Sequence, residues 1–175
     1  MSYSPPQVEG ISTSNVVKSL DVWGTVFQFA SSASAAYPLA NLALYVPFSV
    51  SEAVTAYEGW VVTGGTAGGN FDIGIYSAAG ARLTSSGSTV RGTATITNTT
   101  AMANLVLVPN TRYYLAFAAD STNTYFASAN AAGLHEAMGV LESTTSFVLP
   151  TSPTLTRTTR AYVPYFGLSL WPVAQ

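Results

Sequence analysis

Apolar and polar residues alternate along most of the chain with a period of two, which is the period of a β-strand. In residues 42–48, LALYVPF, every second position is a large apolar residue. The same alternation recurs in residues 71–75, 105–107, 113–117 and 162–170. We expect a strand in each segment. Pro47 cannot donate a backbone hydrogen bond, so the strand over 42–48 is expected at a sheet edge or a bulge.

Turn-forming residues separate these runs at short intervals. Clusters of Gly, Ser, Asn and Thr occupy residues 64–70, 77–80, 85–88 and 97–100. Many short strands with such spacing favour an all-β fold, and we expect an antiparallel, jelly-roll-like β-sandwich.

Two segments depart from the strand pattern. Residues 1–20 contain Pro5-Pro6 and show no sustained period, so we expect an extended N-terminal arm. Residues 21–175 are then expected to form a single β-sandwich domain. Residues 132–141, AGLHEAMGVL, are the best helical candidate, but two glycines interrupt them and we expect a loop or one helical turn.

Residues 69–83, GNFDIGIYSAAGARL, predict a β-hairpin. The connection 77–80 has the length of a type I turn, with Gly80 free to adopt a left-handed conformation. The core face is expected to carry Phe71, Ile73 and Ile75 on the first strand and Ala81 and Leu83 on the returning strand.

The hairpin also carries an acid and a base on its other face. Asp72 alternates with the apolar residues, so we expect a solvated carboxylate there. Arg82 lies on the opposite strand, and a direct pair with Asp72 would require a slipped or bulged register. Gly74 has no side chain, so a neighbouring strand or subunit can approach it closely.

Charge is unusually scarce. Asp, Glu, Lys and Arg make up 8% of the 175 residues and the net charge is −2, against about 25% charged residues in an average soluble domain. No basic stripe is present, so we expect no nucleic-acid partner. No apolar run approaches the ~18 residues of a membrane span, so we expect no membrane insertion. A weakly charged surface favours contact with copies of the chain or with neighbouring proteins, although Ser, Thr and Asn could also solvate it.

The residues that usually carry chemistry are few. The chain has no cysteine and a single histidine, His135, which excludes disulfides, thiolate sites and multi-histidine metal sites. No GxSxG motif marks a serine nucleophile, and the glycines at 64–69 are not followed by the lysine and helix of a P-loop. A glycan hydrolase would need two carboxylates brought together from distant strands. We therefore predict no catalytic, cofactor or metal site and no enzyme activity.

Aromatic residues make up 12% of the chain and supply the candidate contact residues. Exposed aromatic rings stack on sugars and anchor protein interfaces, while buried ones pack in cores. The candidates for contact with a partner or a glycan are Tyr125, Phe126, Tyr165 and Trp171.

Three stretches carry a family resemblance. They are YPLANLALYVPFSVSEAVTAYEGWVV at 37–62, GGNFDIGIYSAAGARLTSSGST at 68–89 and LVPNTRYYLAFAADST at 107–122. In this order they resemble a group of small virion-associated proteins of tailed bacteriophages. The chain departs from the family pattern at Asn110, where a glycine is expected, but Asn can adopt the same positive φ.

The resemblance implies a non-enzymatic structural component of a tailed-phage virion, made in the cytoplasm of the bacterial host. We expect it to assemble on the particle exterior, as a capsid decoration or a tail or fibre component. Its expected partners are other copies of itself, in a homotrimer, and other virion proteins. The alternative is a receptor- or carbohydrate-binding module of a phage fibre that contacts a host surface glycan, and the least favoured reading is a glycan depolymerase.

Overall fold

The computed structural model describes residues 16–18, 33–66, 68–92, 97–128, 132–144 and 147–173. Their regular structure is strands, all paired antiparallel, and one short helix. Among these residues, no helix has the length and hydropathy needed to cross a membrane.

The strands form three sheets. The first has the order β1 (Val16–Lys18), β14 (Phe166–Pro172), β4 (Val54–Val62) and β8 (Thr97–Leu107). The second has the order β13 (Val163–Pro164), β10 (Thr124–Ser128) and β2 (Ala33–Ala36). The third has the order β12 (Thr156–Arg157), β11 (Leu141–Thr144), β3 (Leu42–Phe48), β9 (Tyr113–Ala119), β5 (Asn70–Ser77) and β6 (Arg82–Ser85), and β7 (Thr89–Val90) also pairs with β5.

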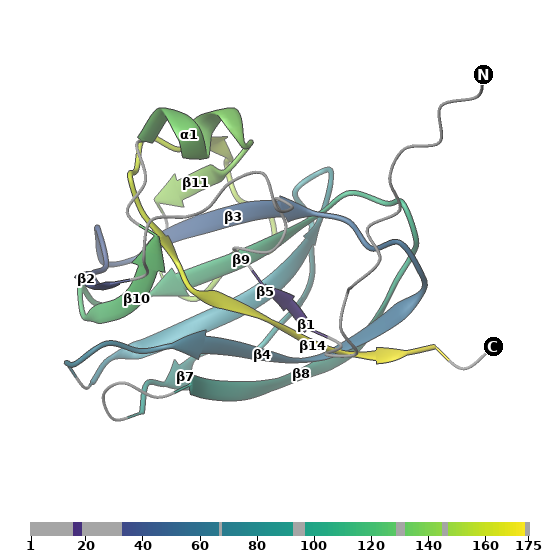
Figure 1. The fold of residues 1–175 in the computed structure, drawn as a ribbon, viewed down its shortest axis with the longest axis horizontal. Coiled ribbons are helices and arrows are strands. Elements are labelled where there is room, and N and C mark those ends of the chain that lie inside the picture. The colour runs from purple at the N-terminus through teal and green to yellow at the C-terminus, as the bar shows by residue number, and fades with distance from the viewer. Residues whose placement is uncertain are drawn as a thin grey trace, which may run out of the picture.

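The first two sheets are joined into one layer. The Val62 amide donates to the Tyr165 carbonyl at 3.0 Å, and the Tyr165 amide donates to the Phe126 carbonyl at 2.7 Å. Figure 1 shows β14 crossing in front of β9 and β5 of the third sheet, with β4 and β8 along the lower edge of the view. The expected all-β sandwich is thus confirmed, whereas the jelly-roll connectivity stays a prediction.

The main core lies between the two layers and follows the predicted alternation. From the third sheet, the core contains the alternating apolar side chains that the sequence predicts on β3, β5 and β9. From the other layer, the predicted apolar side chains of β14 pack against them. Large side chains with no exposed surface include Leu44, Phe71, Ile73, Phe117 and Phe166.

The predicted hairpin forms, with one correction. The Gly80 amide donates to the Ser77 carbonyl at 2.9 Å, and Gly80 has a φ of 84°, as expected for the turn. The expectation that Ala81 and Leu83 face the core is wrong, because both are exposed. A bulge between Ile75 and Tyr76 shifts the register, so Thr84, opposite Ile75, is buried instead.

The second face of the third sheet is covered as well. Residues 147–155, here called the strap, follow β11 and lie over this face. Leu149 and Leu155 of the strap pack there with a second apolar cluster that includes Tyr45 and Tyr76. A Cβ on Gly74 would lie 2.9 Å from Leu149 Cδ1, so the missing side chain lets the strap approach closely.

The position of Pro47 also differs from expectation. β3 is an inner strand between β11 and β9, not an edge strand. However, β11 pairs only with residues 42–45 of β3, so its partnership ends before Pro47. The missing N–H of the proline is tolerated because it falls outside this ladder.

The arm and the helical segment are partly described. Residues 1–15 and 19–20 of the predicted arm lie outside the described residues, while Val16–Lys18 form β1 at the edge of the first sheet. Within the helical candidate, α1 (Ala132–Ala137) has six residues, slightly more than the single turn expected.

Candidate interaction surface

The four aromatic candidates divide between two faces of the layer that contains β14 and β10. Tyr125 has no exposed surface and points into the core, so the outward position predicted for it is wrong. Phe126, Tyr165 and Trp171 alternate with core residues of their strands and therefore lie on the outer face.

The surroundings of Tyr125 explain its burial. Its ring centroid lies 5.1 Å from that of Phe117 and 5.9 Å from that of Tyr37, both in edge-to-face contact. The guanidinium carbon of Arg91 lies 4.9 Å from the Tyr125 ring centroid. Arg91 is itself buried and donates to the Gly64 carbonyl at 3.1 Å. Tyr125 therefore fixes the end of β10 to the core and is not free to bind a partner.

Phe126 and Tyr165 lie together near one end of the outer face. Tyr165 is in edge-to-face contact with Trp60, with ring centroids 5.2 Å apart. Both candidates are half-buried, and Trp60 is buried. Trp60 thus supports Tyr165, and neither Phe126 nor Tyr165 is a fully exposed ring.

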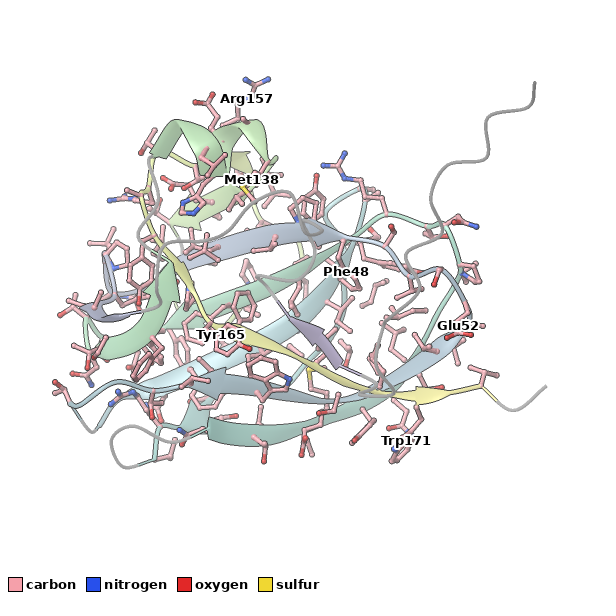
Figure 2. The ribbon with its side chains drawn as sticks, in the orientation of Figure 1. Phe48, Glu52, Met138, Arg157, Tyr165 and Trp171 are labelled. Carbon is pink, nitrogen blue, oxygen red and sulfur yellow. The ribbon has the colours of Figure 1, made fainter. Side chains whose placement is uncertain are left out.

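Trp171 lies at the other end of β14. It projects from the strand well away from Tyr165 (Figure 2). Its ring is stacked on Tyr57 of β4, with centroids 4.0 Å apart and an interplanar angle of 14°. Half of the Trp171 residue surface remains exposed, so the pair presents a flat aromatic surface to solvent.

Valines extend this aromatic pair into a patch. Trp171 is opposite Thr55 of β4, which is opposite Val106 of β8, so the three strands present one row. Val106 and Val108 are each 55% exposed, and Val173 is 36% exposed. The β14 patch is defined as Tyr57, Val106, Val108, Trp171 and Val173.

The β14 patch contains no charged residue. The nearest acidic group in register is Glu58, which is opposite Ser169 and accepts a hydrogen bond from its hydroxyl at 3.0 Å. A partner that covers these five residues alone desolvates no charge, and desolvating an unpaired charge would oppose binding. The exposed Glu52 lies beside the patch, since it precedes Ala53, whose carbonyl accepts the Val173 amide.

Among the carboxylates of the described residues Asp72 is the most buried, and its predicted solvation is wrong. It has no exposed surface, because the strap covers its face of the sheet. Its Oδ2 accepts the Leu149 amide at 3.0 Å, and its Oδ1 accepts the Ser86 hydroxyl at 3.1 Å. Burial raises the pKa of Asp72, and the hydrogen bonds from Leu149 and Ser86 oppose that rise.

Arg82 binds the same strap peptide rather than Asp72. Its side chain donates to the Leu149 carbonyl, and its amide donates to the Thr151 carbonyl at 2.9 Å. Arg82 is opposite Tyr76, whose hydroxyl donates to the Pro150 carbonyl at 2.6 Å. Asp72 and Arg82 of the hairpin thus bind the amide and the carbonyl of Leu149, respectively, and hold the strap against the sheet.

His135 is also buried, in α1. Its Nδ1 lies 2.9 Å from the Arg160 carbonyl oxygen and donates to it. In a Ser-His-Asp triad this nitrogen would donate to a carboxylate, so the arrangement at His135 is not that of a triad. Burial lowers the pKa of His135, which favours the neutral ring.

Three further carboxylates of the described residues bind partners at separate places. Asp120 accepts from the Asn70 amide at 2.8 Å, Glu136 pairs with Arg157 at 3.3 Å, and Glu142 pairs with Arg160 at 3.4 Å. In the described part of the chain, no group of three or more His, Asp or Glu residues could hold a metal ion.

The β14 patch is the most prominent candidate site, and known proteins do not supply a precedent for it. No protein-family model, curated protein or solved structure matches this chain. Its function must therefore be inferred from its own residues.

Of the five patch residues, only Trp171 is among the candidates that the sequence predicts. The predicted contact residues do not include Tyr57, Val106, Val108 or Val173. The signal for Val106 and Val108 is present in the sequence, since Leu105 and Leu107 face the core and the residues between and beyond them must face outward. That these valines lie beside Trp171 follows from the order of β14, β4 and β8 in the sheet, and no local sequence pattern reveals that order.

Proposed function

We propose that this chain is a non-enzymatic structural component of a tailed-phage virion that assembles with copies of itself on the particle exterior. The observation that carries the self-assembly is the β14 patch, where an exposed tryptophan and three exposed valines lie together without a charge. Clustered apolar side chains on a surface mark interaction sites, and tryptophan is enriched among the residues that dominate binding energy. The virion assignment is supported by the resemblance of residues 37–122.

The surface charge agrees with this proposal. Because charged residues make up 8% of the chain, little electrostatic repulsion opposes close packing of identical subunits. The buried polar groups Asp72 and His135 each bind backbone atoms of their own chain, which favours a structural role over catalysis.

The self-assembly proposal predicts a homotrimer that depends on Trp171. Replacing Trp171 with serine should raise the dissociation constant by about 30-fold, since a central aromatic anchor typically contributes about 2 kcal/mol or more to binding. Light scattering coupled to size exclusion, over a dilution series, measures this change.

A valine pair provides the matched control. Val106→Ser changes the patch, whereas Val90→Ser makes the same change at a 77% exposed position on β7, outside the patch. Only Val106→Ser should weaken association. A wild-type protein that stays monomeric at every concentration would contradict self-assembly.

The virion assignment has its own test. Mass spectrometry of purified particles should detect the protein. Hundreds of copies would indicate capsid decoration, and small multiples of three or six would indicate a tail or fibre component. Absence from the particles would overturn the assignment.

A second candidate is a carbohydrate-binding module, favoured by the half-exposed Trp171 ring stacked on Tyr57. Aromatic rings can hold a sugar ring, but a sugar also needs neighbouring hydrogen-bond partners. The valines around Trp171 supply none, so a protein partner fits the patch better. Binding on a glycan array that Trp171→Ser abolishes would reverse this preference.

A further inference from the structure

The position of β1 directs the N-terminal arm toward the β14 patch. Val16 is opposite Ser169, Val17 is opposite Leu168 and Lys18 is opposite Gly167. Because the pair is antiparallel, the chain that precedes Val16 leads toward the C-terminal end of β14. Trp171 and Val173 lie at that end.

The length of the arm argues against binding to its own patch. Trp171 is two residues beyond Ser169, or about 7 Å along the strand. Pro5-Pro6 lie about ten residues before Val16, so an arm that continued extended along β1 would carry them about 33 Å. The prolines would then pass their own Trp171 by about 26 Å and reach an adjacent subunit.

The chemistry of the arm matches the patch. The segment MSYSPPQVEG contains one charged side chain, Glu9, and two adjacent prolines. Prolines hold a chain in the extended polyproline conformation, and such segments dock on grooves lined by aromatic rings. The stacked pair of Trp171 and Tyr57, flanked by valines, offers a flat aromatic surface of this kind.

We propose that Pro5-Pro6 of one subunit bind the β14 patch of the adjacent subunit. The arm would follow its own β14 edge and then cross to the neighbour, so that each subunit donates an arm and receives one. This inference rests on the proposed self-assembly and names the segment that occupies the patch.

Cysteine cross-linking tests the proposal cleanly, because the wild-type chain has no cysteine. Two single-cysteine variants of the full chain, Ser4→Cys and Val173→Cys, are co-assembled and oxidised gently. A disulfide requires Cα atoms within about 7 Å, so a mixed dimer on a non-reducing gel reports the arm at the neighbour's patch. Leu83→Cys, which is 43% exposed on β6 of the opposite sheet, replaces Val173→Cys in the control.

We expect the pair at 4 and 173 to give at least about fivefold more mixed dimer than the pair at 4 and 83. Equal yields would overturn the proposal. The double variant carrying both cysteines in one chain provides the second test. A disulfide within that chain, without links between chains, would place the arm on its own subunit and would also overturn it.

A double-mutant cycle separates this inference from self-assembly itself. Replacing Pro5 and Pro6 with alanine should weaken association, and the effect should largely disappear in a Trp171→Ser background, because contacting residues are not additive. Thr13→Ala is the control within the arm, because continuing the register from Val16 opposite Ser169 places it opposite Pro172 and not opposite a patch residue. Trimers that Trp171→Ser dissociates but the proline substitutions leave intact would refute the arm proposal and leave self-assembly standing, whereas a wild-type monomer would refute both.

Discussion

Replacing Asp72 with alanine should lower the free energy of unfolding by about 2–3 kcal/mol, because the change leaves the buried Leu149 amide without an acceptor. The Leu149 amide would lose its partner under the strap, whereas the Ser86 hydroxyl, which now donates to Asp72, can turn to the Gly87 carbonyl. The loss should therefore be large for a residue that sequence patterns place on a solvated strand face.

Urea denaturation measures this loss, and two variants define its origin. Asp72→Asn keeps the shape and one acceptor for the Leu149 amide, so it should cost about 1 kcal/mol. Its amide can donate to Ser86 Oγ, because that hydroxyl can turn its proton to the Gly87 carbonyl, 3.2 Å away. Glu52→Ala removes an exposed carboxylate and should change stability by less than about 0.5 kcal/mol. Equal effects of Asp72→Ala and Glu52→Ala would refute the structural role of Asp72.

The pH dependence of the same variants gives a second readout. Burial raises the pKa of Asp72 above its ordinary value of 3.8, so the folded protein binds the proton more tightly than the unfolded chain. This tighter proton binding adds to the free energy of unfolding. The contribution is fully present below pH 3.8, and it is lost as the pH rises through the pKa of Asp72 in the folded protein. The wild-type protein should thus gain stability relative to Asp72→Asn on acidification. A gain on raising the pH across the same window would show that the pKa is lowered instead.

The case of Asp72 shows where the sequence pattern stops being informative. Alternation correctly placed Phe71, Ile73 and Ile75 in the core and Asp72 on the other face. It did not reveal that the strap covers that other face, because the strap lies more than 70 residues away in sequence. The burial of a strand's second face is a property of the whole fold and is not encoded within the strand.

Register changes limit the prediction in a similar way. The bulge after Ile75 exchanged the expected roles of Leu83 and Thr84, since a shift of one residue reverses the two faces. Tyr125 and Phe126 are neighbours in β10, so their side chains must point to opposite faces of the sheet and only one of them can lie on the outer face. The sequence pattern does not show which one. Only the packing of Tyr37 and Phe117 decides that Tyr125 is the inner one.

The largest loss of stability is expected for Phe117→Ala, at about 4 kcal/mol. Phe117 has no exposed surface and lies at the centre of the main core. Its ring centroid is 5.1 Å from that of Tyr125, 5.4 Å from that of Phe166, 5.5 Å from that of Tyr37 and 6.2 Å from that of Phe71. These rings come from both layers, so alanine would open a cavity where the layers meet and remove four ring contacts, two of them edge-to-face.

Phe117→Leu is the matched variant, because it retains an apolar side chain and should cost about half as much or less. Val106→Ala, at an exposed position, should stay within about 0.5 kcal/mol of the wild type. Measuring both stability and association in these variants tests whether the core and the β14 patch act independently. Phe117→Ala should lower the stability of the fold but leave the association of folded chains unchanged, whereas Trp171→Ser should do the reverse. If Phe117→Ala instead weakened association as strongly as Trp171→Ser, the patch would not be an independent binding surface, and the effect of Trp171→Ser would need a different explanation.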